Sequence, residues 1–475
     1  MPSSATFTCA LRRSVAAGLL LLCASGAAVA QTQDAYFQFL MARRLEAGGD
    51  HPGALAALER AAAADPASAE VRAEIASFQL RRDNEDDAER EALQALGLDE
   101  ANLEAHRVLG MIYATRVDAM RARTPQALVV ARAREAITHL ERATGEAALG
   151  IDIQIHYSLG RLYLRTDEPL KAVDAFLRVV DQNPASAQGR LSLAQAYASA
   201  EDITKAVATL KVIVDDEPRV ASTLAQYQEQ AGLLKEAAES YTRALAIEPT
   251  SRGLKFRRIA ALYNARNFVQ AAAFAEEAQS QHPEDLRFPR LHARAVFEGG
   301  DPGRALAILE PTARAHPTDV TTQLALADLY NDAGRDREAE RTLRRYLDAE
   351  PADAQALNHL GYLLANRGRA LDEAVRLVER ALVAEPGNPS YLDSLGWVYV
   401  RRGDFSEAEK YLSPAAEQLP RNAVVQDHLG DALAGQGRWV DAIAAWTRAL
   451  LAGTGGIDRR VVERKVENAT SKIPR

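Results

Sequence analysis

The sequence predicts an all-α solenoid of about twelve helix-turn-helix units stacked one on the next. Three observations support this prediction: prolines recur with a period of 34 residues, an alanine precedes each of them at a fixed distance, and leucine and tyrosine recur four residues apart. The 475-residue chain is 47% apolar but only 6% aromatic, which favours cores packed from small side chains. A fixed period of this length is typical of repeat architectures.

The prolines give the length of the unit. The gaps between successive members of the series are 34, 31, 34, 34, 34, 35 and 34 residues. A proline ring cannot continue a helix, so each proline is expected just after the second helix of a unit. Three further slots keep the period, at Pro66, Glu100 and Thr454. The main series is Pro184, Pro218, Pro249, Pro283, Pro317, Pro351, Pro386 and Pro420.

An alanine stands twelve residues before every one of these eleven slots. We expect two antiparallel helices to cross closely at this residue, because a larger side chain would push their backbones apart. Overpacking such a contact typically costs about 1 to 3 kcal/mol. The alanines are Ala54, Ala88, Ala172, Ala206, Ala237, Ala271, Ala305, Ala339, Ala374, Ala408 and Ala442.

The leucine–tyrosine pairs belong to the first helix of each unit, helix A, because residues i and i+4 share one helix face. Examples are Leu159-Gly160-x-x-Tyr163 and Leu395-Gly396-x-x-Tyr399. Together with the alanines and prolines, they make the chain resemble the tetratricopeptide repeat family from about Ala35 to Gly453. The resemblance implies a right-handed α-solenoid. The best-matching segment, Ile153 to Pro184, carries Leu159, Gly160, Tyr163, Ala172, Phe176 and Pro184.

Two units depart from the period. Sixteen extra residues lie between Glu100 and Pro184, and an extended helical hairpin is expected at about residues 114–150. This insertion is either a docking projection or a tolerated loop insertion. The unit that ends at Pro249 is three residues short.

The amino terminus has the features of a secretory signal peptide over residues 1–30. Arg12 and Arg13 precede an apolar run, and Ala28-Val29-Ala30 forms a cleavage motif. The protein is therefore expected to be exported to the periplasm or cell envelope. Lipidation of Cys23 is an alternative. Membrane association is expected only through a partner or through an N-terminus that stays uncleaved or lipidated.

The solenoid is expected to span residues 31–455, and residues 456–475 are expected to form a capping helix and tail. Gly455 and Gly456 break the last unit, and the segment after them alternates apolar and charged residues. Repeat arrays need such a helix to cover the apolar end of the stack.

The composition and motifs argue against catalysis and against several classes of ligand. The net charge is −8, and it becomes −10 once residues 1–30 are removed, which disfavours nucleic acid. The sequence after residue 30 has no cysteine, no HExxH pair and no phosphate-binding loop, so no metal or cofactor is expected. Ser394 has no expected histidine base, because His359 and His428 occupy equivalent repeat positions.

The resemblance implies that helix A lines a groove that binds protein or peptide partners. Acidic residues among the groove positions favour a basic or neutral ligand. Trp397 either contributes to this strip or packs within the interior, and both interpretations stay open. The groove positions of the last three units are Asn358, Tyr362, Asp393, Trp397, Asp427 and Asp431.

The segment from Asn358 to Trp446 is also similar to the carboxyl-terminal repeats of exported bacterial envelope proteins of this family. The leading hypothesis is a non-catalytic exported scaffold or adaptor that binds partner proteins in envelope protein assembly, proteolysis or export. The alternative is a structural spacer of the cell envelope that self-associates through the ends of its solenoid.

Overall fold

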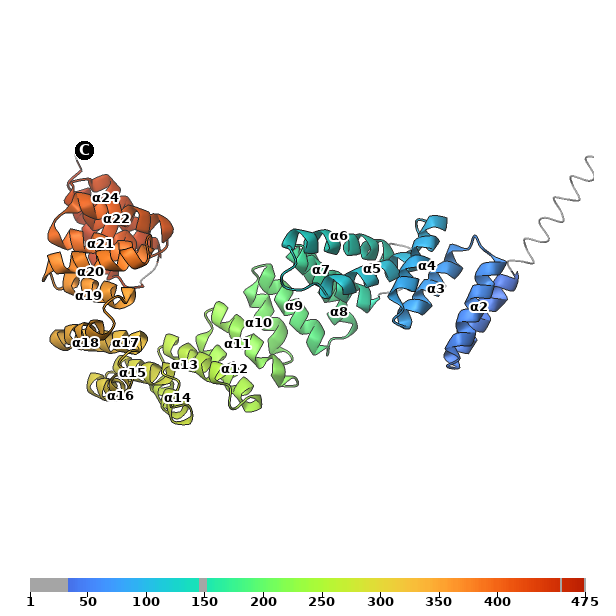
Figure 1. The fold of residues 1–475 in the computed structure, drawn as a ribbon, viewed down its shortest axis with the longest axis horizontal. Helices are drawn as coiled ribbons and strands as arrows, with labels where there is room; N and C mark the ends of the chain where they lie inside the picture. The colour runs from blue at the N-terminus through green and yellow to red at the C-terminus, as the bar shows by residue number, and fades with distance from the viewer. Residues whose placement is uncertain (1–32, 145–151, 453–454, 474–475) are drawn as a thin grey trace, which may run out of the picture. The chain divides into compact units, whose positions relative to one another are not determined.

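A computed structural model describes residues 33–144, 152–452 and 455–473 (Figure 1). The predicted signal peptide lies outside these residues. Within the described ranges the regular structure is entirely helical, with no strand. No helix in these ranges combines the length and apolarity needed to cross a membrane.

The first six repeats each consist of a helix A followed by a helix B. Residues 33–47 form the first helix A. The remaining helices of these repeats are α2 (His51–Ala64), α3 (Ala69–Arg81), α4 (Glu85–Leu98), α5 (Leu103–Asp118), α6 (Gln126–Ala143), α7 (Ile153–Arg165), α8 (Pro169–Gln182), α9 (Ala187–Ser199), α10 (Ile203–Lys211), the 3-10 helix η1 (Pro218–Val220), α11 (Ala221–Gln230) and α12 (Leu234–Ile247).

The last six repeats follow the same order and end in one extra helix. Their helices are α13 (Arg252–Asn264), α14 (Phe268–Gln281), α15 (Arg287–Glu298), α16 (Pro302–Ala315), α17 (Val320–Asp332), α18 (Asp336–Ala349), α19 (Ala354–Asn366), α20 (Leu371–Ala384), α21 (Pro389–Arg402), α22 (Phe405–Gln418), α23 (Ala423–Gly435), α24 (Trp439–Ala452) and α25 (Arg459–Thr470).

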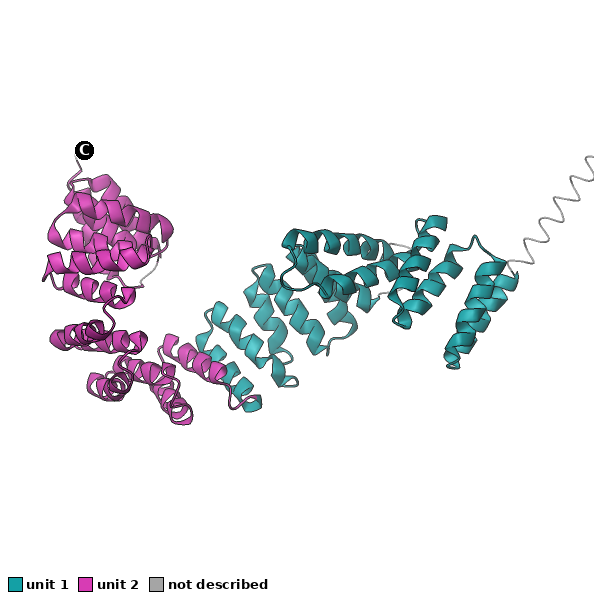
Figure 2. Ribbon diagram, in the orientation of Figure 1, with its two compact units in different colours: residues 1–247 teal, residues 248–475 magenta. Residues whose placement is uncertain are grey.

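The chain divides into two compact units, Met1–Ile247 and Glu248–Arg475 (Figure 2). The first unit holds repeats 1 to 6, and the second holds repeats 7 to 12 with α25. Within each unit, neighbouring A helices pack against one another as well as against their own B helices. The predictions of an all-α solenoid, of twelve helix pairs and of a capping helix are therefore confirmed.

In most repeats a Ser, Asp or Asn two positions after the proline slot starts the next helix A. Ser68, Ser186 and Asp353, for example, each accept a hydrogen bond from a backbone N–H of the first turn. Such caps satisfy backbone donors that have no partner inside the helix. The proline therefore ends one repeat while the following Ser, Asp or Asn begins the next.

Helices A and B of a repeat cross at the predicted alanine. All eleven alanines of this series are fully buried. In repeat 11 the facing residue of helix A is Gly396, where an added Cβ would lie 2.4 Å from Leu412 Cγ and 3.1 Å from the carbonyl oxygen of Ala408. The crossing is therefore close enough that both helices need a small residue there.

The departures from the period have local structural causes. The helices α5 and α6 have 16 and 18 residues, whereas most A and B helices have 13 and 14. Ala136 is fully buried and takes the place of the crossing alanine. The shortened repeat has a nine-residue α10 and a ten-residue α11. The 35-residue step places one extra residue between α19 and α20, where Ala370 has a left-handed φ of 47°.

The last helix, α25, packs on α24. Val462 and Ala469 are its buried residues, at 1% and 2% exposure. It takes the place of the helix A of a further repeat and so covers the end of the stack.

Candidate partner-binding surface

The six predicted groove residues share two positions of the repeat, seven and eleven residues after the proline slot. All of them belong to the second unit. We call the surface formed by these two positions the helix-A face. Along the chain, α19 carries Asn358 and Tyr362, α21 carries Asp393 and Trp397, and α23 carries Asp427 and Asp431.

The centre of the predicted strip is an interlocked group. Asp393 is only 7% exposed, and His428 Nδ1 donates a hydrogen bond to its Oδ1 at 2.9 Å. The His428 ring stacks on Trp397 with the ring centroids 4.1 Å apart. Trp397 Nε1 in turn donates to Asn366 Oδ1 at 2.7 Å. Trp397 is thus partly buried and ties three consecutive A helices together.

Ser394 does not take part in this group. Its hydroxyl donates to the backbone carbonyl of Ser390, one turn earlier, at 3.0 Å. Asp393 and His428 are therefore a scaffold pair between repeats, and the serine beside them is engaged with its own helix. Among the described residues, no three His, Cys, Asp or Glu side chains form a group that could hold a metal ion.

The last two predicted residues are held by the capping helix. Lys465 Nζ lies 2.8 Å from Asp427 Oδ1 and 2.7 Å from Asp431 Oδ1. Trp446 Nε1 also donates to Asp431. Burial raises the pKa of Asp431, and the charge and hydrogen bond of Lys465 act in the opposite direction. Both acids at this end of the helix-A face are therefore already engaged within the chain.

The first two predicted residues line a small opening of about 320 Å³ together with Asp393. The side-chain oxygen of Asn358 is buried there and has no hydrogen-bond partner within the described residues. Burial raises the pKa of Tyr362. The structure thus brings Asn358, Tyr362 and Asp393 to one opening, while Asp427 and Asp431 belong to the capping contact.

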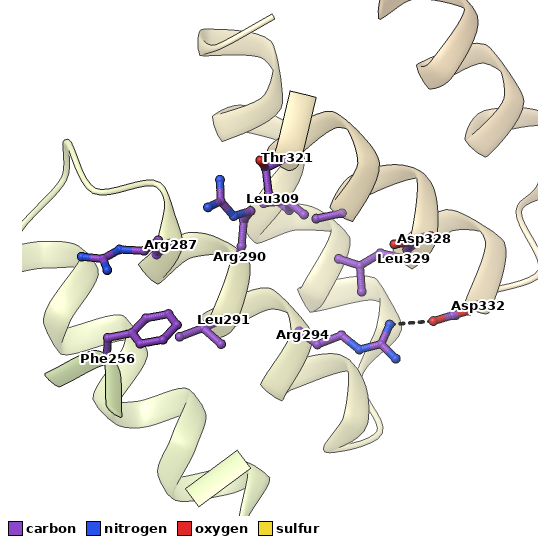
Figure 3. A pocket seen from close by; sticks show the side chains of 11 residues that line it. Phe256, Arg287, Arg290, Leu291, Arg294, Leu309, Thr321, Asp328, Leu329 and Asp332 are labelled. Atoms are coloured by element: carbon purple, nitrogen blue, oxygen red, sulfur yellow. Dashed lines mark hydrogen bonds and ion pairs between the residues drawn. The ribbon is translucent and has the colours of Figure 1, made fainter. Parts of the chain in front are cut away.

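A larger pocket, which the sequence reasoning missed, lies on repeats 7 to 9 (Figure 3). Its volume is about 660 Å³. We call it the α15 pocket, because four of its residues come from that helix. It is lined by Phe256, Arg287, Arg290, Leu291, Arg294, Leu309, Thr321, Ala325, Asp328, Leu329 and Asp332.

The signal for the α15 pocket was present in the sequence. Phe256 and Arg290 stand seven residues after their proline slots, and Arg294 and Asp328 stand eleven residues after theirs. These are the same two positions as in the predicted strip. Applying these two positions to repeats 7 to 9, and not only to the last three repeats, would have identified these four pocket residues.

Three arginines of α15 lie at the pocket. They are spaced i, i+3 and i+7, so one helix face carries all three. Arg294 bonds Asp332 at 2.6 Å, the contact drawn in Figure 3. Although burial alone would lower the pKa of Arg294, hydrogen bonds with Tyr263 and Asp332 hold it above its usual range.

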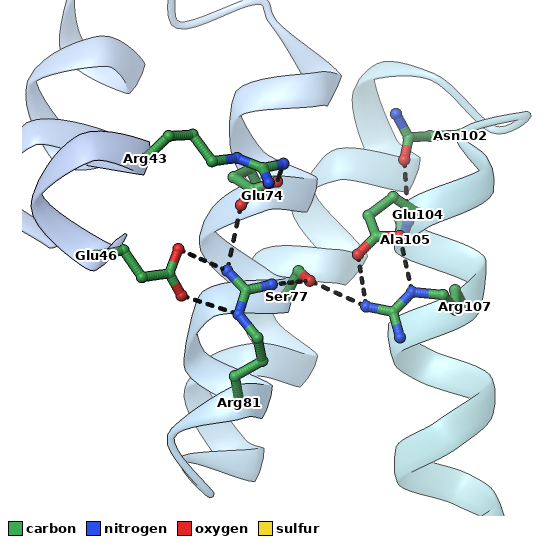
Figure 4. A network of polar contacts seen from close by, with 9 residues as sticks. All are labelled: Arg43, Glu46, Glu74, Ser77, Arg81, Asn102, Glu104, Ala105 and Arg107. Atoms are coloured by element: carbon green, nitrogen blue, oxygen red, sulfur yellow. Dashed lines mark hydrogen bonds and ion pairs between the residues drawn. The ribbon is translucent and has the colours of Figure 1, made fainter. Parts of the chain in front are cut away.

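In the first unit the A helices carry a polar network that includes Ser77 and Arg107, which stand at these two repeat positions (Figure 4). Arg107 donates to Ser77 at 2.9 Å and pairs with Glu104 at 2.7 Å. Arg81 bridges to Glu46 on the preceding helix A and to Glu74 on its own helix. Burial would raise the pKa of Glu104, but its contacts with Arg107 and Ser77 hold it below its usual range. These ties join repeats 1 to 3.

Comparison with known proteins agrees with this architecture. Models of the tetratricopeptide repeat match residues 157–220, 296–360 and 394–456. The TPR repeat-containing protein PA4667 of Pseudomonas aeruginosa is 26% identical over 181 residues. That match covers 37% of this chain and 30% of the relative, so the chain spans less than a third of the relative's length.

Two solved structures are similar over most of the chain. Yeast Tom70 is similar over 92% of this chain and 96% of that chain, with a TM-score of 0.46 and 13% identity. The Naa15/Naa10 complex bound to HypK-THB is similar over 87% of this chain and 68% of that chain, with a TM-score of 0.42 and 16% identity.

The stacked helix pairs and their shared A-helix surface define a helical-repeat protein of the kind that serves as a protein–protein interaction scaffold. The repeats over residues 157–220, 296–360 and 394–456 match tetratricopeptide repeats, the family that the leucine, tyrosine, alanine and proline positions predicted.

Proposed function

We propose that this chain is an exported, non-catalytic scaffold that binds a segment of a partner protein along the helix-A face of its second unit. It would act as an adaptor in envelope protein assembly, proteolysis or export. The observation that carries the proposal is the α15 pocket, an opening of about 660 Å³ with an apolar floor at repeat positions directed to that face.

The floor of the pocket explains how binding would gain free energy. Leu309 and Leu329 are already buried, while Phe256, Leu291 and Ala325 are partly exposed. Burying one large apolar side chain of a partner typically contributes about 1.5 to 3 kcal/mol. Preformed pockets that accept such an anchor dominate many protein interfaces.

The test is in-cell photocrosslinking from a probe that replaces Ala325 in the pocket. The control probe replaces Val383, which is 81% exposed on α20, outside the pocket. We expect one set of proteins to be captured from position 325 and not from position 383. Identical adducts from both positions, or none from position 325, would contradict the proposal.

Export is proposed on the sequence of residues 1–30 alone. Mass spectrometry of the protein purified from its native cells should find the mature N-terminus at Gln31. An intact Met1 would contradict this cleavage, and a lipid mass on Cys23 would replace it with membrane anchorage.

A second candidate function is end-to-end self-association. The first helix A exposes Tyr36, Phe37 and Leu40 at 65%, 57% and 48%. Sedimentation velocity of the Phe37→Ser variant tests it. Oligomers that grow with concentration and disappear in the variant would support the spacer function, whereas a monomer at all concentrations would exclude it.

A further inference from the structure

The acids of the helix-A face are already engaged by the repeat that follows each of them. His359 Nε2 lies 2.7 Å from Asp328 Oδ1, and His428 holds Asp393 in the same way. The two acids of α23 share the lysine of α25. A basic partner side chain would have to displace these contacts. The expectation of a basic or neutral ligand rested on these acids, and their contacts do not support it.

The arginines of the α15 pocket differ, because two of them keep unused donors. Arg290 uses only Nη1, which donates to Asp319 and Thr322 at 3.1 Å. Arg287 uses Nε and Nη2 on Asp285. Within the described residues this leaves Nε and Nη2 of Arg290 and Nη1 of Arg287 without a hydrogen-bond partner. A guanidinium carries five N–H donors, so both side chains can bind a further acceptor.

These donors adjoin an apolar surface. The Arg287 guanidinium lies 5.1 Å from the centroid of the Phe256 ring. Leu291 stands next to Arg290 in the sequence and lines the same pocket (Figure 3). A ligand group that enters the pocket therefore meets cationic donors and a leucine-rich floor together. Carboxylates suit the planar donor arrangement of arginine, which binds them through two parallel hydrogen bonds.

We propose that the α15 pocket receives a partner segment in which an Asp or Glu stands beside a large apolar residue. The apolar side chain packs on Leu291 and the buried leucines, and the carboxylate accepts hydrogen bonds from Arg290 and Arg287. This inference rests on the proposed function for the existence of a protein partner and adds the chemistry of its binding segment.

The experiment is selection of a random twelve-residue peptide library, displayed on phage, against the full chain. We expect the recovered peptides to be enriched in Asp or Glu next to Leu, Ile, Phe or Met. Synthetic copies of these peptides should bind the Arg290→Gln variant at least tenfold more weakly, because a charge-assisted bidentate contact is lost. Arg290→Lys keeps the charge without the planar fork and should give an intermediate affinity.

Two further variants keep the test independent of folding. Leu291→Ala removes an apolar contact of the pocket floor without removing a polar contact and should weaken binding of the same peptides. Arg337→Gln makes the same charge change on α18, away from the pocket, and should leave binding unchanged. The thermal unfolding midpoint of each variant shows whether it is folded.

Several results would overturn the inference. They are the absence of any enriched peptide, enrichment of Lys or Arg, and acidic peptides that bind Arg290→Gln and Leu291→Ala as well as the parent chain. If crosslinks from position 325 were still found in cells, only the partner chemistry would fail. If those crosslinks were absent as well, the proposed function would fail with it.

Discussion

At the scale of single residues, the fold depends on where side chains are smallest. Gly396 faces Leu412 across the A–B crossing, and Gly361 faces Val378 in the same way one repeat earlier. An added methyl group at either glycine would lie about 2.5 Å or less from the facing side chain and 3.1 Å from a backbone carbonyl. The backbone carbonyl cannot move without shifting helix B.

We therefore expect Gly396→Ala to lower the free energy of unfolding of the second unit by about 1 to 3 kcal/mol. The matched control is Gly253→Ala on α13, where an added Cβ meets nothing within 4 Å. That change should be neutral or slightly stabilising, because alanine restricts the unfolded chain. Urea unfolding followed by tryptophan fluorescence reports this unit, because all three tryptophans belong to repeats 11 and 12. Equal effects of the two changes would contradict the close crossing.

The repeat tyrosines add a second residue-level contribution, a hydrogen bond to the preceding helix B. Tyr330 donates to Glu310 at 2.6 Å, and Tyr113 donates to Glu89 at 3.1 Å. Burial, and then the hydrogen bond to the glutamate, raise the pKa of each tyrosine to about 12. The protonated hydroxyl therefore stabilises the fold fully below about pH 10, the ordinary tyrosine value. This contribution is lost as the pH rises through about 12.

Tyr330→Phe should cost about 1.5 kcal/mol at pH 7, the typical value of a hydrogen bond to a charged group. The difference from the parent chain should shrink between pH 10 and pH 12. Tyr411→Phe is the control, since no hydrogen bond of the Tyr411 hydroxyl is found within the described residues. Denaturant unfolding at a series of pH values measures both. A difference that stays constant to pH 12 would show that the Tyr330–Glu310 bond does not form.

At the scale of elements, α25 is part of the polar surface as well as a cap. Its Lys465 is the shared partner of Asp427 and Asp431, and all three side chains are mostly buried. Removing the ammonium would leave two carboxylates close together without their cation. The cost of an uncompensated buried charge exceeds what a surface ion pair contributes.

Lys465→Gln should lower the stability of the second unit by about 1 to 3 kcal/mol at pH 7. The folded-state pKa of Asp431 is raised, so its ionisation opposes folding at neutral pH and this cost disappears as the pH falls and the carboxyl is protonated. The variant should therefore approach the parent chain in acid. Lys410→Gln, which breaks the exposed pair with Glu407, should change stability little at any pH. An equal loss at acidic and neutral pH would contradict this assignment.

The elements also show how far the sequence could predict this protein. The period fixed the order and number of helix pairs, because proline and the Ser, Asp or Asn two residues later act locally. The period could not predict that Lys465 binds Asp427 or that His428 binds Asp393. These contacts join neighbouring repeats, and the side chains that meet differ from one pair of repeats to the next. The α15 pocket was missed for another reason. The assignment of residues to repeat positions was correct, but groove residues were predicted only for the last three repeats.

At the scale of the whole molecule, a repeat array is stabilised mainly by contacts between nearest neighbours. Within each of the two compact units, the helices of a repeat pack on one another and on those of the neighbouring repeats. A change in one repeat should therefore be felt within its own unit and not at a distance along the chain.

Ala408→Leu tests this locality. Overpacking the fully buried crossing should cost about 1 to 3 kcal/mol, whereas the neighbouring Glu407→Gln should do little. Hydrogen exchange should show faster opening in α21 and α22 and unchanged protection in α3 and α4 of the first unit. Loss of protection in α3 and α4 would mean that the chain unfolds as one cooperative body.

The polar ties between neighbouring A helices have a consequence for how such a protein diversifies. Arg294, Asp393 and Trp397 are at once residues of the helix-A face and residues that join one repeat to the next. A substitution at one of these residues that alters ligand preference also weakens the contact between two adjacent repeats, unless the partner residue in the adjacent repeat changes as well. New specificities should therefore be acquired as paired substitutions in adjacent repeats, and libraries that vary one repeat at a time should return mostly unstable chains.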